Sequence, residues 1–191
     1  MTPHESGTIL AISGSLKRSS INSSVLRAAA AAAAWDGISV TIDHSVRELP
    51  HFDPDLETQP PEEVLQFRAA CQSAAGVLLA VPEYVFGIPG SFKNALDWTV
   101  GAGSLYRKPV SVLSVAHPGR GEHVRRALEL VMKALDADVV HHSVPVVAGD
   151  RDEHGEIANA RIIDELLAVV VELANRAGRA AAAKPFSPAP I

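Results

Sequence analysis

Short apolar runs alternate along the chain with longer segments whose apolar residues recur at helical spacing. The apolar runs are typical of strands buried on both faces, because they are continuous and rich in Val, Ile and Leu. The predicted strands are residues 8–13, 38–46, 76–81, 109–116 and 138–147. The predicted helices are residues 22–35, 62–74, 89–101, 123–135 and 156–183. In the second helix we expect Val64, Leu65, Ala69 and Cys71 to face the core.

Strands that alternate with helices predict an α/β fold, with a parallel sheet covered by helices on both faces. The most apolar strands, the first, third and fourth, are expected at the centre, and the more mixed second and fifth at the edges. This predicts the doubly wound order 2-1-3-4-5, with its switch point between strands one and three. We expect one domain over residues 1–191, with a core at about 8–183, an exposed charged turn at 149–155 and a loose Pro-rich tail at 184–191.

Composition narrows the function classes. The formal charge of −5 and the pI of about 5.9 argue against nucleic acid as the main partner. Cys71 is the only cysteine, so no internal disulfide is available, and we expect a buried, inert thiol. No segment has a signal-peptide layout or the length to span a membrane, which predicts a soluble, cytoplasmic protein. The histidines lack ligand spacing, so we expect no metal site.

The loop after the first predicted strand, residues 14–22, combines short polar side chains with two cations. Ser15, Ser20 and Asn22 supply hydroxyl and amide groups, and Lys17 and Arg18 supply positive charge. The loop opens a helix, whose N-terminus favours an anion, so a phosphate group is the natural ligand. The alternative is an ordinary serine N-cap beside two solvated cations.

The stretch after the third predicted strand, residues 82–98, contains two prolines, two glycines and the aromatic residues Tyr84 and Phe86 before a helix begins. In a parallel α/β sheet such a turn lies at the carboxyl ends of the strands, where ligands bind. The two aromatics offer area for a flat ring. The alternative is that both belong to the core or to a subunit interface.

These two segments resemble motifs of the NADPH-dependent FMN reductase family, a flavodoxin-like group. Residues 82–98 are similar to its PEYN-x-x-x-PG-x-x-KNA-x-DW signature, with Val85 where the family has Asn. The first loop is similar to its GS-x-R-x-x-S-x-N phosphate loop, with Lys17 in the Arg position. The resemblance implies FMN as cofactor. The residues expected to bind it are Ser15, Lys17, Arg18, Ser20, Ile21, Asn22, Pro82, Glu83, Tyr84, Val85, Phe86, His117 and Gly119.

The resemblance also implies an activity. NADPH or NADH would reduce bound FMN by hydride transfer to its N5, and the electrons would pass to a small acceptor: a flavin, a quinone, an azo compound or a metal ion. No side chain needs to act as acid or base, and Glu83 is expected to be structural. Lys93 and Asp97 are expected to pair and Trp98 to pack. A homodimer or homotetramer is implied.

Val85 leaves alternatives open, because its side chain replaces none of the hydrogen bonds of an Asn. FMN would then bind through main-chain groups alone, or more weakly. The rival hypotheses are a flavodoxin-like electron carrier and a degenerate, non-catalytic member with weak or no FMN binding. A carrier would not oxidise NADPH unaided, and a degenerate member would not take up added FMN.

Overall fold

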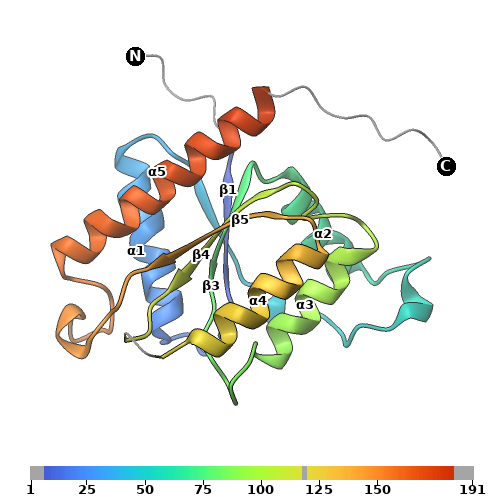
Figure 1. Ribbon diagram of the computed structural model, residues 1–191, viewed down its shortest axis with the longest axis horizontal. Helices are drawn as coiled ribbons and strands as arrows, with labels where there is room; N and C mark the ends of the chain where they lie inside the picture. The colour runs from blue at the N-terminus through green and yellow to red at the C-terminus, as the bar shows by residue number, and fades with distance from the viewer. Residues whose placement is uncertain (1–6, 118–119, 183–191) are drawn as a thin grey trace.

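A parallel sheet of five strands forms the centre of the computed structural model, which describes residues 7–117 and 120–182 (Figure 1). The strand order is β2-β1-β3-β4-β5, as the hydrophobic pattern predicts. The central strands are apolar because helices cover both of their faces. The strands are β1 (Ile9–Ser13), β2 (Val40–Asp43), β3 (Gly76–Ala80), β4 (Pro109–Ser114) and β5 (Asp138–Ser143).

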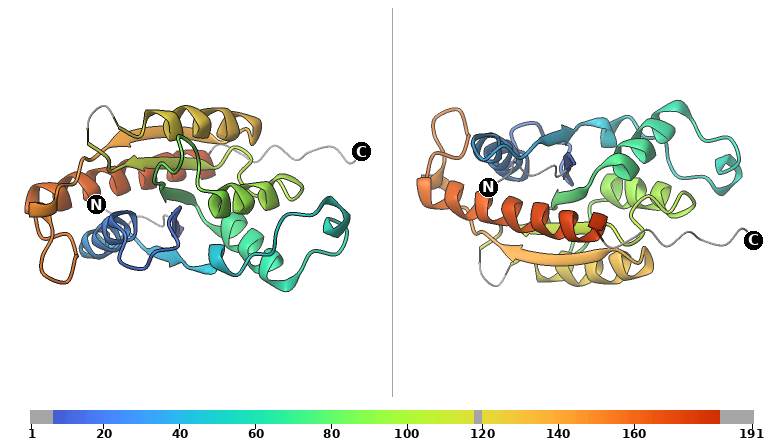
Figure 2. Two further views of the ribbon diagram at one scale, coloured as in Figure 1. Left: turned by 90° about the horizontal axis from the view of Figure 1, so that it is seen from below. Right: turned by 90° about the horizontal axis from the view of Figure 1, so that it is seen from above.

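The longer helices divide into two groups on opposite faces of the sheet (Figures 1 and 2). They are α1 (Ile21–Trp35), α2 (Glu62–Ser73), α3 (Gly90–Val100), α4 (Glu122–Ala134) and α5 (Ala160–Ala182). Helices α1 and α5 cover one face, and α2, α3 and α4 cover the other. Successive residues of β1 point to opposite layers, so Ile9 belongs to the first core and Leu10 to the second.

Helix α2 corrects one prediction. Val64 and Cys71 are buried as expected, but Leu65 and Ala69 are exposed. The inward stripe runs through positions 64, 67, 68 and 71, which is one helical face. It includes Arg68, a charged residue that the spacing of the apolar residues does not predict on the buried face. Both oxygens of the Glu57 carboxylate accept from the Arg68 guanidinium, at 2.8 and 3.0 Å, and so neutralise it.

The segment before α5 corrects a second prediction. The helix begins at Ala160 and not at residue 156. The preceding turn is not fully exposed, because Asp150 is 6% exposed and accepts hydrogen bonds from the Val147 N–H and the Asn159 amide. Glu156 lies before the helix and forms a bidentate pair with Arg27 on α1, at 2.6 and 3.0 Å.

Other predictions are confirmed. Trp98 is fully buried, and Lys93 pairs with Asp97 at 2.6 Å. Cys71 is fully buried, and burial raises the pKa of its thiol to about 12.

None of the helices in the described ranges is long and apolar enough to cross a membrane. The predicted tail, 184–191, lies outside the described residues.

Candidate functional site

The loops after β1, β3 and β4 meet at the carboxyl edge of the sheet. The strand register pairs Ser13 with Ala80, so the first loop leaves the sheet beside the end of β3. The Gly14 N–H donates to the Ala80 carbonyl at 2.8 Å. A Cβ at Gly14 would lie 2.8 Å from a methyl carbon of Val81, so this close approach requires glycine.

The first loop, residues 14–22, ends in a capped helix N-terminus. The Ser20 side chain accepts from the Ser23 N–H at 3.0 Å, which identifies Ser20 as the N-cap of α1. The N–H groups of Ile21 and Asn22 come earlier in the helix and have no intrahelical acceptor. Together with the helix dipole, they make this end of α1 a favourable place for an anion.

The turn after β3, residues 82–88 and here called the aromatic turn, is built on a two-residue reversal. Tyr84 and Gly87 exchange two backbone hydrogen bonds, at 3.0 and 3.1 Å. Val85 and Phe86 between them both have positive φ, +49° and +57°. The Tyr84 hydroxyl lies 3.3 Å from the Ser15 hydroxyl, so the aromatic turn and the first loop are in direct contact.

The aromatic turn is also tied to helix α4. The Glu83 carboxylate accepts from the N–H groups of His123 and Val124, at 3.0 and 3.1 Å. The Phe86 ring packs edge-on against His123, with ring centroids 4.9 Å apart. Glu83 therefore acts as a structural cap of α4, in agreement with the role expected for it.

A cavity of about 530 Å³ lies where these segments converge, and we call it the central cavity. This volume is in the usual range for a small-molecule site. Its wall combines the start of α1, the aromatic turn, the end of β4 and the start of α4. The lining residues are Ile21, Asn22, Val81, Pro82, Glu83, Phe86, Ser114, Val115, Ala116, Arg120, Gly121, Glu122, His123 and Val124.

One buried polar atom in this wall lacks a partner. Asn22 is 7% exposed, and its Oδ1 has no hydrogen-bond partner within the described part of the chain. A buried amide oxygen without a donor is costly, so the site suits a ligand that brings one. The hydroxyl groups of a ribityl chain are donors of this kind.

Five of the predicted cofactor-binding residues line the central cavity: Ile21, Asn22, Pro82, Glu83 and Phe86. Ser20 and Tyr84 adjoin the lining residues Ile21 and Glu83 in the chain but do not line the cavity themselves, and Ser15 lines a different cavity. Val85 points away, with 98% of its surface exposed. It therefore does not plug the cavity.

The remaining predicted residues lie elsewhere. Lys17 and Arg18 line a different cavity, on the β2 side of the first loop. His117 is exposed and borders an adjoining hollow of about 350 Å³, which also contains His141 and His142 and shares lining residues such as Ser114 and Gly121 with the central cavity. Gly119 lies outside the described residues.

Sequence reasoning missed several lining residues. Ser114 and Val115 continue an apolar strand, so nothing local indicates a site there. His123 lies at the start of α4, and only the tertiary contact with Phe86 brings it to the cavity. Gly121 had a usable signal, since a glycine just before a helical segment indicates an N-cap, and here its φ is +79°.

The sequence profile described as NADPH-dependent FMN reductase matches residues 8–152. The chain belongs to this family. The match spans both loops of the central cavity and the whole sheet, so the family assignment and the geometry concern the same part of the molecule.

Relatives of this FMN reductase family member come from several organisms. A probable NADPH:quinone oxidoreductase 1 of rice is 30% identical over 86% of this chain and 89% of its own length. A probable NADPH:quinone oxidoreductase 2 of rice is 41% identical, and that match covers 47% of this chain and 46% of the relative. The structure of FerB from Paracoccus denitrificans, a flavoenzyme NAD(P)H:(acceptor) oxidoreductase, has a TM-score of 0.72 at 24% identity, covering 91% and 98% of the two chains, and shows the shared fold.

The residues present fit the cofactor of the family. The start of α1 suits a phosphate, the aromatic turn offers apolar area and backbone groups, and Asn22 offers an unused acceptor. Within the described residues no group of three or more His, Cys, Asp or Glu side chains could hold a metal ion.

Proposed function

We propose that this chain is an FMN-dependent NAD(P)H oxidoreductase that reduces a small acceptor of the quinone or flavin class. The observation that carries the proposal is the central cavity, where a helix N-terminus, an aromatic turn and an unpartnered Asn22 Oδ1 converge. The family match covers the same segments. The quinone part of the proposal draws on the names of the two rice relatives.

In this proposal the first loop binds and orients the phosphate end of FMN. Ser15, Ser20 and the N–H groups of Ile21 and Asn22 supply donors at the start of α1, and Lys17 adds positive charge at the loop. The backbone of residues 82–86 would meet the polar edge of the ring, and Tyr84 and Phe86 would supply apolar area. Val85 would contribute through its main chain alone.

Bound FMN supplies the redox chemistry, because it accepts a hydride from a reduced pyridine nucleotide and passes electrons to the acceptor. The protein contributes alignment and shielding from water. The Glu83 carboxylate accepts hydrogen bonds from two backbone N–H groups of α4 and is not placed to move a proton. The residues of the site therefore act by position and electrostatics.

The direct test is a titration of the purified protein with FMN, followed by NADPH oxidation with benzoquinone as acceptor. We expect FMN fluorescence to be quenched and nucleotide oxidation to depend on both FMN and the quinone. Bound FMN without nucleotide oxidation would indicate an electron carrier. No quenching at all would indicate a member without flavin, and either result overturns the proposal.

The variant Asn22→Ala tests the central cavity itself. We expect FMN affinity to fall about tenfold, the effect of losing one good hydrogen bond. The melting temperature of the flavin-free protein should not fall, because the Asn22 Oδ1 has no partner to lose. Gln66→Ala, an exposed change on α2, is the matched control. If the native protein, Asn22→Ala and Gln66→Ala bind FMN with equal affinity, the central cavity is not the FMN site.

A further inference from the structure

Residues 147–159, between β5 and α5, form a small hairpin, and we call this segment the brace. Arg151 and Ile157 pair across it as an isolated antiparallel bridge. The Asp152 carboxylate accepts hydrogen bonds from two backbone N–H groups of the turn, both at 2.9 Å. The hairpin is therefore held by its own hydrogen bonds and offers its side chains to the rest of the molecule from a fixed backbone.

The Arg151 guanidinium connects the brace to the first loop. Its Nε donates to the Gly155 carbonyl at 2.7 Å, and its Nη2 donates to the Ser19 carbonyl at 3.4 Å. Gly155 has a φ of +81°, and a Cβ there would lie 2.6 Å from the Arg151 Nη2. The guanidinium therefore packs against the turn of the brace, and only a glycine at position 155 leaves room for it.

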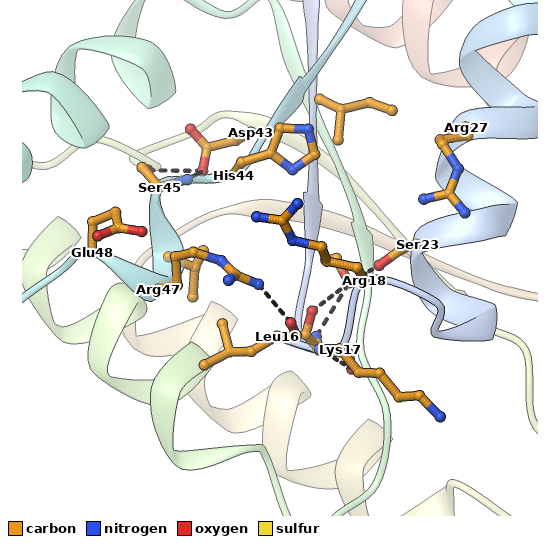
Figure 3. A pocket seen from close by; sticks show the side chains of 14 residues that line it. Leu16, Lys17, Arg18, Ser23, Arg27, Asp43, His44, Ser45, Arg47 and Glu48 are labelled. Carbon is orange, nitrogen blue, oxygen red and sulfur yellow. Dashed lines mark hydrogen bonds between the residues drawn. The ribbon is translucent and has the colours of Figure 1, made fainter.

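A second contact joins the brace to the helix that the first loop opens. Both oxygens of the Glu156 carboxylate accept from the Arg27 guanidinium, at 2.6 and 3.0 Å. Figure 3, which shows the cavity on the β2 side of the first loop, places Arg27 and Ser23 on the same helix, α1. The two side chains of the ion pair are 40% and 43% exposed, so the pair adds little to stability. Its bidentate geometry nevertheless fixes where α1 lies relative to the brace.

The two halves of the first loop are held differently. The first half, residues 14–16, is hydrogen-bonded to β3, to the aromatic turn and to Arg47. For the second half, residues 17–19, Arg151 is the one hydrogen-bonding partner from outside the loop among the residues that the structure describes. Residues 17–19 lead directly into Ser20, the N-cap of α1, and so into the anion site at the start of that helix.

A loop that is already held in its bound position loses less conformational entropy when a ligand arrives, and this favours binding. We propose that the brace holds the first loop and the start of α1 in position for the phosphate of FMN, with Arg151 and Glu156 as positioning residues. Neither residue lines the central cavity, so both act through the first loop and α1. The family profile ends at residue 152, so Glu156 lies beyond the segment that it matches. This inference rests on the proposed function, because it assumes FMN at the start of α1.

The binding test compares FMN with riboflavin, which lacks the phosphate. For Arg151→Gln we expect FMN affinity, measured by fluorescence quenching, to fall about fivefold and riboflavin affinity to change less than about twofold. For Glu156→Gln we expect FMN affinity to fall about threefold, because the ion pair with Arg27 is partly exposed. Arg179→Gln, an exposed change near the end of α5, is the control for a lost positive charge.

Two further variants separate position from charge. Gly155→Ala keeps every charge but displaces the Arg151 guanidinium, so it should also lower FMN affinity more than riboflavin affinity. Gly37→Ala is its matched control, because Gly37 has a φ of +73° but lies beyond the other end of α1 with no atom nearby. Arg151→Lys keeps the charge but lacks the planar fork that reaches the Gly155 and Ser19 carbonyls together. It should lose about as much FMN affinity as Arg151→Gln.

Two binding results would overturn the inference. Equal losses of FMN and riboflavin affinity in Arg151→Gln would show that the brace supports the whole fold and not the phosphate end of the flavin. Full FMN affinity in Arg151→Lys would show that Arg151 acts only through its charge.

Hydrogen exchange of the flavin-free protein tests the brace without the cofactor. In Arg151→Gln we expect the backbone N–H groups of residues 17–22 to exchange faster than in the native protein and in Gly37→Ala, because the loop opens more readily without its outside partner. Unchanged exchange would contradict the positioning role.

The failure of this inference can be told apart from the failure of the proposed function. If NADPH is oxidised through FMN but Arg151→Gln keeps the native FMN affinity, the inference fails and the oxidoreductase activity stands. If the native protein binds neither flavin, the proposed function fails, and the role of the brace in FMN binding fails with it. Faster exchange in Arg151→Gln would then still support the contact between the brace and the first loop.

Discussion

Val85 holds a backbone conformation that is poorly suited to a β-branched residue. Its φ of +49° lies in the left-handed region, which Asn and Gly adopt readily and Val does not. Val85 and Phe86 occupy the central positions of a two-residue reversal, where Asn-Gly is the preferred pair. The 98% exposure of Val85 means that no packing compensates for the strain. The family motif places Asn here, so the substitution affects the backbone as well as the side chain.

This strain predicts that Val85→Asn stabilises the protein. We expect the free energy of unfolding to rise by about 1 kcal/mol, because the left-handed conformation costs a non-glycine residue about 1–2 kcal/mol. Urea denaturation measures the change. Val85→Gly is the matched control, since it relieves the strain without adding an amide group.

Flavin affinity then separates the two roles of Asn in the motif. If Val85→Asn tightens FMN binding and Val85→Gly does not, the amide contacts the flavin. Equal tightening by both variants would assign the effect to the ordered backbone. Unchanged stability in both would contradict the strain argument.

At the scale of elements, Glu83 joins two segments that are distant in the sequence. Helix α4 has Gly121 at its N-cap, which offers no side chain to the free N–H groups of the first turn. The Glu83 carboxylate takes that place for His123 and Val124. The aromatic turn and the helix that borders the central cavity are thereby fixed to each other.

Removing this charge should cost stability without altering acid–base behaviour. For Glu83→Gln we expect the free energy of unfolding to fall by about 1 kcal/mol, the usual value of a charged cap. The pH profile of NADPH oxidation should keep its shape. Glu129→Gln is the control, because Glu129 lies on the same helix away from the central cavity and forms only a surface pair with Arg125, worth under about 0.5 kcal/mol. A lost limb of the pH profile in Glu83→Gln would show a proton-transfer role.

At the scale of the whole molecule, each face of the sheet has its own core, and Cys71 belongs to the one beneath α2, α3 and α4. Burial raises the pKa of its thiol from 9.0 to about 12, with the charge of Asp43 adding to the effect. The unfolded chain therefore ionises this thiol at lower pH than the folded protein does. The linked stability is complete below pH 9 and is lost as the pH rises toward 12.

We expect the stability of the native sequence to fall above pH 9 by up to about 1 kcal/mol per pH unit from this thiol. Cys71→Ala lacks that contribution, so the stability difference between the two proteins should narrow as the pH rises. Urea denaturation at about pH 8 and about pH 10.5 measures it. A constant difference would show that the thiol ionises equally in both states.

The homo-oligomer implied by the family resemblance stays a prediction. Val100 at the end of α3 and Leu130 on α4 are large exposed apolar side chains that such an assembly would cover. Light scattering would test it, because an assembly has a mass that is a multiple of the 20.1 kDa chain. A mass of one chain at micromolar concentration would contradict it.

The order of the strands was predictable from the chain, because strands buried on both faces keep continuous apolar runs and edge strands do not. The first loop and the aromatic turn were also predictable, because Ser, Pro, Gly and Asn favour turns and helix starts through local effects on the backbone. The inward face of α2 was only half predicted. Arg68 lies inside because of Glu57, a partner supplied from another segment.

Tertiary structure alone brought Glu83 to the start of α4 and His123 to Phe86, whereas Asn22 and the aromatic turn were already expected at one cofactor. These groupings depend on parallel strands that place the ends of separate segments at one edge of the sheet. Periodicity and capping reflect interactions between neighbours in the chain. A cavity and its charge depend on distances between residues that are far apart in the chain. Those distances are set only when the strands have assembled into the sheet.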